Sequence, residues 1–219
     1  MSGPLAGRRV LVSAGPTFED IDPVRFVGNR SSGKMGFAVA TAARAMGATV
    51  VLVAGPVHLP TPDGVRRVDV RSAAQMHAAV LAELPADVYI GAAAVADFTP
   101  RAVSEHKIKK TAGSDTLVLE LVRTPDILAE VAAHPQRPAL VVGFAAETHE
   151  LERYARGKLQ AKRLDLIAAN LVGAAEGGFE RDDNALVVYW EGGERRLGPA
   201  AKTEVAAQLV QLAAERVAA

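Results

Sequence analysis

The feature that most constrains the fold is the alternation of short β-branched apolar runs with longer alanine-rich stretches. Arg9–Ala14 and Thr49–Ala54 are apolar runs that end next to a glycine, and each is typical of a buried strand. Residues 35–46 lie between them without a breaker from Gly36 to Gly47, which predicts a helix with Gly47 as its C-terminal cap. This order predicts an α/β fold, a mostly parallel sheet with helices on both faces.

The rest of the chain continues this alternation with one interruption. Residues 97–115 are polar, carry three lysines close together and have no clear periodicity. Two apolar runs near the C-terminus are joined through Gly192-Gly193, which predicts a hairpin before the last helix. The other predicted helices are 72–84, capped by Ser72, 126–133, 148–162 and 199–218, and the other predicted strands are 87–94, 116–122, 139–144, 165–169, 185–190 and 195–197.

Composition excludes several classes of protein and site. The 219 residues are 49% apolar and 23% charged, which is enough to bury the core of a globular protein. The formal net charge is zero, so we expect no nucleic-acid and no membrane partner, and no apolar run approaches the ~20 residues that span a bilayer. The absence of cysteine excludes disulfides and a cysteine nucleophile. We expect a cytoplasmic protein in which residues 1–7 are a linker or a cloning remnant.

The loop after the first predicted strand carries the first candidate site. A dinucleotide fingerprint G-x-G-x-x-G is missing there, which argues against an ordinary NAD site. Instead Ser31-Ser32-Gly33-Lys34 stands at a predicted helix start, where N–H groups, hydroxyls and a lysine suit a phosphate or carboxylate. The glycine spacing from Gly28 imitates a Walker A loop, but Met35 stands where that loop has its metal-binding Ser or Thr. The alternative is a serine N-cap followed by a flexible glycine.

Arg25 and Asn29 lie just ahead of this loop. Arginine can clamp an anion with two parallel hydrogen bonds, and asparagine can donate to a developing oxyanion without adding charge. Alternatively, both side chains only hold a long loop in place.

Two further strand ends carry polar side chains. Asp97 follows the small-residue run that begins at Gly91, where a ribose or a planar ring could approach the backbone. Residues 107–110 hold three lysines, which form either a phosphate-binding cluster or a solvated surface. Phe144 closes a predicted strand, so it belongs to the core or stacks on a base. Lys158 and Lys162 are four residues apart and therefore share one face of a helix.

Taken together, these segments resemble the phosphopantothenoylcysteine synthetases, specifically the synthetase half of the bacterial bifunctional coenzyme A enzymes. The resemblance runs in order over most of the chain, and its most specific stretch is Asn29-Arg-Ser-Ser-Gly-Lys-Met-Gly-Phe37. The other matching segments are residues 14–17, 22–26, 93–97, 107–110, 125–127, 143–148, 154–156 and 165–170, with Phe179, Asp182 and Asn184.

The resemblance implies a Rossmann-like fold with an inserted flap and a C-terminal hairpin plus helix, assembled as a homodimer. Residues 8–219 then form a single nucleotide-binding ligase domain. It implies that CTP activates 4′-phosphopantothenate to an acyl-cytidylate, with Mg²⁺ as cofactor, and that L-cysteine then displaces CMP. The choice of CTP over ATP follows from the bacterial resemblance alone, because no base-reading residue is identifiable.

The resemblance also implies roles for individual residues. Asn29 and Lys107 are the expected catalytic residues, and Arg25, Asn29, Ala92 and Ala93 the expected contacts of the acid substrate. Asp97 is also a candidate metal ligand. The expected nucleotide-binding residues are Ser31, Ser32, Gly33, Lys34, Gly91, Ala92, Ala93, Asp97, Lys107, Pro125, Asp126, Ile127, Leu128, Phe144, Lys158 and Lys162.

Two departures and two rival functions remain. Leu171 stands where the family usually has aspartate. The sequence does not include the flavin-dependent decarboxylase half that is usually fused upstream, so we expect either an excised domain or a stand-alone synthetase, and no flavin in this domain. Tyr154 and Lys158 have the Tyr-x-x-x-Lys spacing of short-chain NAD(P)-dependent reductases, although this spacing is common on helices. A non-catalytic nucleotide-binding domain is the second rival, and it would not need Asn29 or Lys107.

Overall fold

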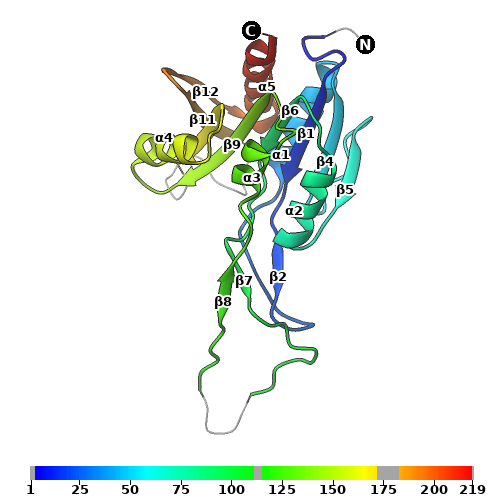
Figure 1. Ribbon diagram of the computed structural model, residues 1–219, viewed down its shortest axis with the longest axis vertical. Helices are drawn as coiled ribbons and strands as arrows, with labels where there is room; N and C mark the ends of the chain where they lie inside the picture. The colour runs from blue at the N-terminus through cyan, green and yellow to red at the C-terminus, as the bar shows by residue number, and fades with distance from the viewer. Residues whose placement is uncertain (1–2, 111–114, 172–182, 219) are drawn as a thin grey trace.

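The structure is a computed structural model, and it describes residues 3–110, 115–171 and 183–218. Its centre is an eight-stranded sheet in the order β12-β11-β10-β9-β6-β1-β4-β5 (Figure 1). The first six strands of this sheet along the chain run parallel, and the last two join it antiparallel. The strands are β1 Arg9–Ala14, β4 Thr49–Ala54, β5 Arg66–Asp69, β6 Val88–Gly91, β9 Leu140–Glu147, β10 Leu166–Leu171, β11 Asp183–Trp190 and β12 Gly193–Ala201.

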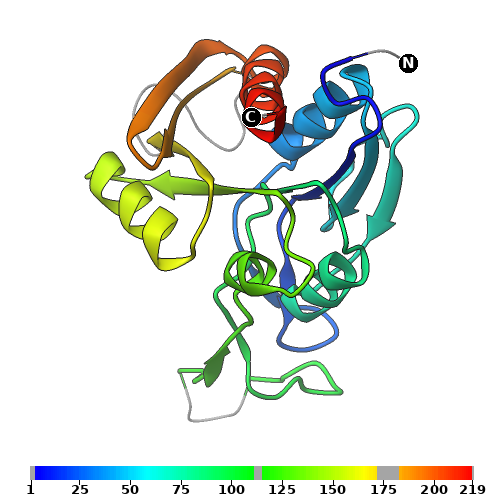
Figure 2. The ribbon, with the colours of Figure 1, turned by 45° about the horizontal axis from the view of Figure 1, so that its top comes forward.

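Helices cover both faces of the sheet, as predicted. The helices α1 Lys34–Ala45 and α5 Lys202–Ala218 pack against each other on one face, where Figure 2 shows them side by side. The helices α2 Ala73–Ala82, α3 Ile127–Ala133 and α4 Leu151–Ala161 share the second core on the other face. Each face therefore buries one hydrophobic layer, which is how parallel sheets are stabilised.

Local sequence explains why the helices begin and pack where they do. Ser72 caps α2 by accepting a hydrogen bond from the Gln75 N–H, and the Gln75 side chain returns a bond to the Ser72 N–H, a complete capping box. Gly36 lets α1 approach the sheet closely, because a Cβ added there would lie 2.4 Å from the Cβ of Ala14. The start of α1 is thereby held directly over the end of β1.

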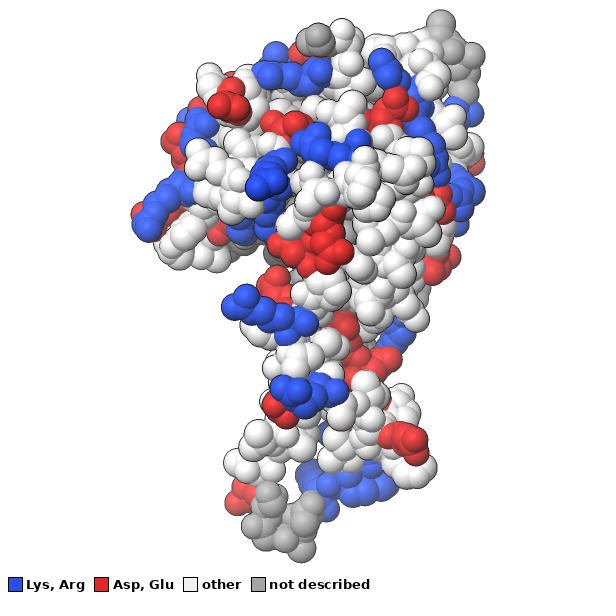
Figure 3. Space-filling view, viewed as in Figure 1, with Lys and Arg blue, Asp and Glu red and all other residues white. Residues whose placement is uncertain are grey.

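A slender arm extends from this body. It is built from two short hairpins, β2 Phe18–Asp20 with β3 Phe26–Gly28, and β7 Phe98–Pro100 with β8 Leu121–Arg123. Figure 3 shows the arm as a narrow extension below the body. Its large apolar side chains are exposed, namely Val24, Phe26, Phe98, Val103, Leu117, Val118, Leu119 and Leu121.

The structure corrects several expected elements. Leu5 lies in the segment expected to be a linker, yet its side chain is buried and its N–H bonds to the Met46 carbonyl at 3.0 Å. The strand expected at 116–122 is reduced to Leu121–Arg123, because only these residues pair with β7, while the apolar residues before them face solvent. Strand β5 and the hairpin β2–β3 were not predicted at all, because short strands carry a weak periodicity signal. Within the described residues, no helix is long and apolar enough to cross a membrane.

Candidate active site

The site lies where the order of the sheet reverses. From β1 the chain passes to β4 and β5 on one side, then returns to β6 and continues to β9 and β10 on the other. Ligands of open α/β sheets bind at such a switch point, beyond the carboxyl ends of the strands. Two cavities of about 540 and about 520 Å³ open at this point, and Ala93, Val95 and Phe144 line both of them. We name them the α3 pocket and the α1 pocket after the helices at their walls.

The α1 pocket is strongly basic. Four of its lining side chains are lysine or arginine, and among the described residues that line it none is aspartate or glutamate. The pocket is lined by Asn29, Arg30, Ser31, Ser32, Gly33, Lys34, Met35, Gly36, Ala92, Ala93, Ala94, Val95, Phe144, Ala145, Ala146, Lys158, Asn170, Asn184 and Lys202. A ligand with more than one negative charge fits this lining best.

The start of helix α1 forms one end of this pocket. Its N-cap is Gly33 in the left-handed conformation (φ 74°), which has no side chain to accept from the first N–H groups of the helix. The Ser31 hydroxyl accepts instead from the Gly33 N–H at 3.3 Å. The alternative of a serine N-cap is therefore wrong, since Gly33 occupies the N-cap position, and the positive end of the helix faces the cavity.

Asn29 lies at the other side of the α1 pocket. Its amide nitrogen donates to the Val95 carbonyl at 2.9 Å and makes a longer contact of 3.4 Å with the Ala94 carbonyl. The loop after β3 is thus fastened to the segment after β6. The asparagine is held against the strand end that both pockets share.

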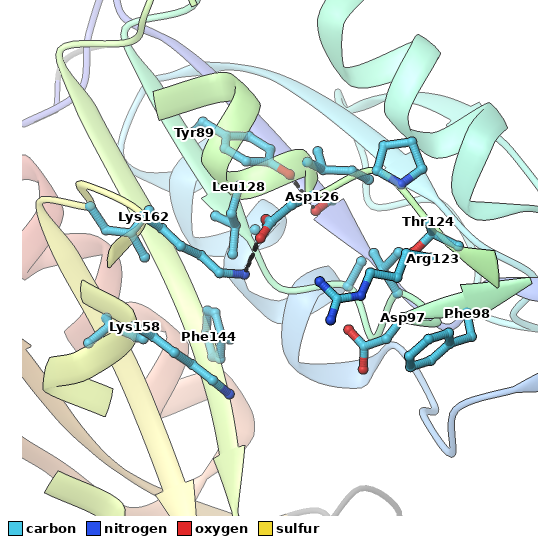
Figure 4. A pocket seen from close by; sticks show the side chains of 18 residues that line it. Tyr89, Asp97, Phe98, Arg123, Thr124, Asp126, Leu128, Phe144, Lys158 and Lys162 are labelled. Carbon is cyan, nitrogen blue, oxygen red and sulfur yellow. Dashed lines mark hydrogen bonds and ion pairs between the residues drawn. The ribbon is translucent and has the colours of Figure 1, made fainter. Parts of the chain in front are cut away.

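The α3 pocket is mixed in charge and more apolar at its floor. Figure 4 shows Lys158 and Lys162 reaching from α4 toward Phe144, with Asp97 and Arg123 on the opposite wall. It is lined by Ser13, Tyr89, Gly91, Ala93, Val95, Asp97, Phe98, Arg123, Thr124, Pro125, Asp126, Ile127, Leu128, Phe144, Lys158, Lys162, Leu164 and Ile167. Aromatic, aliphatic and charged groups together suit a base, a ribose and phosphates.

The two lysines of α4 are both ion-paired. The Nζ of Lys162 lies 2.9 Å from the Asp126 carboxylate, which also caps α3 by accepting from the Ala129 N–H at 3.1 Å. The Nζ of Lys158 lies 2.7 Å from the Glu147 carboxylate at the end of β9. Because they are four residues apart, both line the α3 pocket from one side, although the Lys158 side chain also remains 46% exposed.

The floor of the α3 pocket contains a buried tyrosine. Its hydroxyl lies 3.0 Å from the Ser13 hydroxyl, across the junction of β1 and β6. Burial raises the pKa of Tyr89 to about 12, so its hydroxyl is a neutral hydrogen-bonding group. Neither Tyr89 nor Ser13 was identified from the sequence, because both lie inside apolar strands that carry no motif.

The segment between the pockets is fixed by two threonines. Thr17 is fully buried and its hydroxyl accepts from the Ala96 N–H at 3.0 Å, while the Thr124 hydroxyl donates to the Ala96 carbonyl at 2.6 Å.

Four residues line both pockets, and we call them the shared rim: Ala93, Val95, Phe144 and Lys158. A group bound in one pocket can therefore meet a group bound in the other.

The structure brings most of the expected site residues together, with three differences. Ser31 to Lys34 line the α1 pocket with Asn29 and lie apart from the base-sized α3 pocket, and Ala92 likewise lines only the α1 pocket. Arg25 and Lys107 line neither cavity. Arg25 is instead bound to the Asp22 carboxylate through its guanidinium, and its hydrogen bonds hold the pKa of Asp22 well below its usual range. Of the other segments of the resemblance, Phe179 and Asp182 lie outside the described residues.

No preformed metal centre accompanies the pockets. Among the described residues, no group of three or more histidines or acids could hold an ion. Asp97 and Asp126 both line the α3 pocket. This fits Mg²⁺, which is commonly held by one or two carboxylates together with the phosphates of a substrate.

Figure 3 shows basic and acidic side chains interspersed over most of the face in view, with one group of acidic side chains near the middle of the body. The α1 pocket differs from this face, because the described residues that line it include four basic and no acidic side chains.

Comparison with known proteins agrees with this geometry. Residues 5–217 match the family described as the DNA/pantothenate metabolism flavoprotein C-terminal domain. The chain is 51% identical over 214 residues to the coenzyme A biosynthesis bifunctional protein CoaBC of Vibrio cholerae and 50% identical over 203 residues to that of Escherichia coli. These matches cover 97% and 92% of this chain but 54% and 50% of the relatives. The chain thus spans about half the length of the curated relatives it matches.

Solved structures extend the comparison to the fold. The C-terminal domain of a CoaBC protein superposes with a TM-score of 0.83 at 39% identity, covering 99% of both chains. A mutant of Cab2, solved in complex with phosphopantothenate-cysteine, shares the fold with a TM-score of 0.78 at 18% identity and covers 96% of this chain and 87% of that one.

Proposed function

The chain belongs to the family of the DNA/pantothenate metabolism flavoprotein C-terminal domain, and from this we propose that it is a phosphopantothenate–cysteine ligase of coenzyme A biosynthesis. One observation of this structure carries the proposal beyond family membership. Two pockets of different character meet along one shared rim at the switch point of the sheet. A ligase that joins an acid to a nucleotide needs this arrangement.

The α1 pocket takes 4′-phosphopantothenate. This acid carries a phosphate at one end and a carboxylate at the other, and the pocket has four basic side chains with a helix start at one end. The phosphate lies at Ser31 to Lys34, and the carboxylate reaches the shared rim. The sequence instead predicted that this loop binds the nucleotide. The variant Lys34→Gln distinguishes the two assignments through its Michaelis constants for the acid and for CTP. If only the Michaelis constant for CTP rises, the loop binds CTP and not the acid.

The α3 pocket takes CTP. Phe144 and Leu128 provide apolar contact area for the base, and Asp97 is placed to accept from a ribose hydroxyl. Lys158 and Lys162 lie on the side of the phosphates, where each can exchange its carboxylate partner for a phosphate oxygen. Lys158 belongs to the shared rim, so it can contact the phosphate nearest the acid.

The first half-reaction forms the acyl-cytidylate. A carboxylate oxygen of the acid attacks the α-phosphorus of CTP, the bond to the β-phosphate bridge breaks, and pyrophosphate leaves with the electron pair. Two anions repel each other in this step, so the cationic side chains around the rim and Lys107 of the arm are needed to stabilise the transition state. Mg²⁺ held by Asp97 and the phosphates would supply further charge neutralisation.

The second half-reaction forms the amide. The neutral amine of L-cysteine attacks the acyl carbon, and the carbonyl oxygen gains negative charge. The C–O bond to CMP then breaks as the carbonyl reforms, CMP leaves with the electron pair, and the nitrogen loses one proton. Asn29 lies against the rim, where its amide nitrogen donates to the Val95 carbonyl at 2.9 Å and to the Ala94 carbonyl at 3.4 Å, and the longer of these bonds can be exchanged for one to that oxygen. A neutral donor of this kind stabilises the oxyanion without adding a charge to the site.

The exposed apolar arm supports a homodimer as the working form. The relatives are bifunctional proteins of about twice this length, so we also propose a flavin-dependent decarboxylase as the functional partner, acting in the cytoplasm. No flavin site is assigned to this chain.

Pyrophosphate release is the experiment that tests the proposed function. Purified protein is incubated with 4′-phosphopantothenate and CTP, with and without cysteine, and ATP replaces CTP in a parallel series. We expect pyrophosphate only when the acid is present, and the phosphopantothenoylcysteine mass only when cysteine is added. Pyrophosphate release that is independent of the acid, or NAD(P)H oxidation in its place, would reject the ligase.

A further inference from the structure

A single buried carboxylate joins the two halves of the arm. Asp22 lies in the turn between β2 and β3, and its side chain is fully buried, with 0% exposed. Its Oδ1 accepts from the Val24 N–H at 2.8 Å and the Arg25 N–H at 2.9 Å. Its Oδ2 accepts from the Arg25 guanidinium, with Nε at 3.0 Å, and from the Ile108 N–H at 3.1 Å. One oxygen therefore shapes the local turn, and the other binds a segment more than 80 residues away.

The bound segment is the one that carries Lys107. Beyond the bond from the Ile108 N–H to Asp22, the Ile108 carbonyl accepts from the Nη2 of Arg25 at 3.0 Å, so both polar atoms of that residue are held. On the other side of Lys107, the Ser104 N–H donates to the Ile21 carbonyl at 3.0 Å. The turn between β2 and β3 thus grips the segment at two points that flank the lysine.

We propose that Asp22 is a positioning residue of the first half-reaction, holding the Lys107 segment at a fixed place relative to the loop that carries Asn29. This inference rests on the proposed function. The strand β3 that follows the Asp22 turn leads directly to Asn29, so the carboxylate ties the place of one functional residue to that of the other.

A purely local role for Asp22 does not explain its contacts. Shaping the turn requires only Oδ1 and the two backbone N–H groups that it binds. The bonds of Oδ2 reach Ile108 directly and through Arg25, and they engage the Nε and Nη2 of the guanidinium that was expected to bind the acid substrate. Arg25 therefore acts with Asp22 on the segment, and its own lack of contact with either pocket follows from that.

Asp22→Asn is the variant that tests the proposal. Its remaining carbonyl oxygen can keep the turn contacts, while an amide nitrogen replaces the oxygen that faces Ile108 and Arg25, so donors face donors. Asp20→Asn is the matched control, because Asp20 lies on the same hairpin and pairs with Arg71, away from the segment. Amide hydrogen exchange is followed at Ser104 and Ile108, and each half-reaction is measured separately in single-turnover experiments.

We expect amide exchange at Ile108 to accelerate and acyl-cytidylate formation to slow, each by about tenfold or more, the effect of losing one charge-assisted hydrogen bond. The Michaelis constants for CTP and the acid should stay within about threefold, because neither pocket contains Asp22. The cysteine step from preformed acyl-cytidylate should proceed at the wild-type rate. Asp20→Asn should leave all of these quantities unchanged.

Other outcomes overturn the inference. If Asp22→Asn slows both half-reactions equally, or accelerates exchange without slowing activation, Asp22 has only a structural role. Should Asp22→Asn fail to fold, Ile108→Pro removes the same N–H donor while keeping the carboxylate, and unchanged activation in that variant rejects the proposal. Failure of the ligase itself is distinguishable, because the wild type would then release no pyrophosphate while the exchange at Ile108 still reports the contact.

Discussion

The sheet body buries its apolar side chains, whereas the arm leaves many of its own exposed to solvent. In the body, Leu11 and Ile167 are almost completely buried in the second core, and most strands run between covered faces. On the arm, Val118 is 88% exposed and Phe26 and Phe98 lie open as well. The body therefore buries its own apolar surface, whereas the arm carries an uncovered apolar surface, which we propose that a second copy of the chain buries.

This difference separates binding from activation. Most of the groups that we propose to bind the nucleotide, such as Phe144, Lys158 and Lys162, belong to the body, and the arm adds Phe98 and Arg123 to the wall of the α3 pocket. Lys107 belongs to the arm and lines neither pocket in this structure. We infer that ligands bind to the body first and that the arm supplies a charge to the chemistry.

Replacing the arm lysine should give the largest effect. We expect Lys107→Gln to slow acyl-cytidylate formation by about 10³-fold, the loss typical of removing one charge-stabilising group from a transition state. CTP affinity, measured by calorimetry, should stay within a few-fold because the nucleotide pocket is intact. Lys109→Gln is the control two residues away and should retain most of the activity. If Lys107→Gln abolished CTP binding with no separate loss of rate, the lysine would be only an electrostatic anchor.

The sequence predicts the elements of the body much better than those of the arm. β1 and β4 were predicted to the residue and α1 nearly so, because buried β-branched runs and an unbroken alanine-rich stretch carry strong periodicity. The strands of the arm could not be predicted, because they are three residues long and many of their apolar residues face solvent. Lys158 and Lys162 could be placed on one helix face from spacing alone. The role of Asp22 could not, because it depends on contact with Ile108 across the arm.

Truncating one apolar side chain in each region tests whether the arm has a hydrophobic core of its own. We expect Leu11→Ala to lower the free energy of unfolding by about 3 kcal/mol, since the side chain is buried and its removal leaves a cavity. Val118→Ala should change it by less than about 0.5 kcal/mol, since the side chain has few neighbours to lose. Urea denaturation at low protein concentration checks both values. A large loss from Val118→Ala would show that the arm packs against something even in the monomer.

Asn29 lies on the body side of the site, so replacing it should affect a different step from replacing Lys107 of the arm. We expect Asn29→Asp to slow the cysteine step by about 10²-fold while activation proceeds, because the variant loses the N–H donors that face the rim. Mass spectrometry should then detect accumulated acyl-cytidylate. Asn170→Asp places the same charge in the same pocket, and it should raise the Michaelis constant of the acid without accumulation. Full turnover by Asn29→Asp with no intermediate would remove Asn29 from the mechanism.

The smallest expected effect is the loss of stability on acidification, which we compare for one carboxylate of the body and one of the arm. In the body, Asp87 accepts from the Arg9 N–H at 2.7 Å and from Arg8 at 2.9 Å. Partial burial by itself raises its pKa, but these hydrogen bonds and the charge of Arg8 outweigh that and lower the pKa overall. In the arm, the side-chain bonds from Arg25, with backbone donors in addition, lower the pKa of Asp22 further.

A lowered folded-state pKa means that each contribution to stability is complete above the unfolded pKa of about 3.9 and is lost as the pH falls through the folded value. We therefore expect the stability difference between wild type and Asp87→Asn, about 1 kcal/mol or less, to shrink as the pH falls below about 4. Carbon-13 NMR titration of the carboxyl groups should show Asp87 protonating before Asp22. The reverse order would mean that the arm releases the Lys107 segment before the body loosens, and the arm would then be the weaker of the two structures at acid pH.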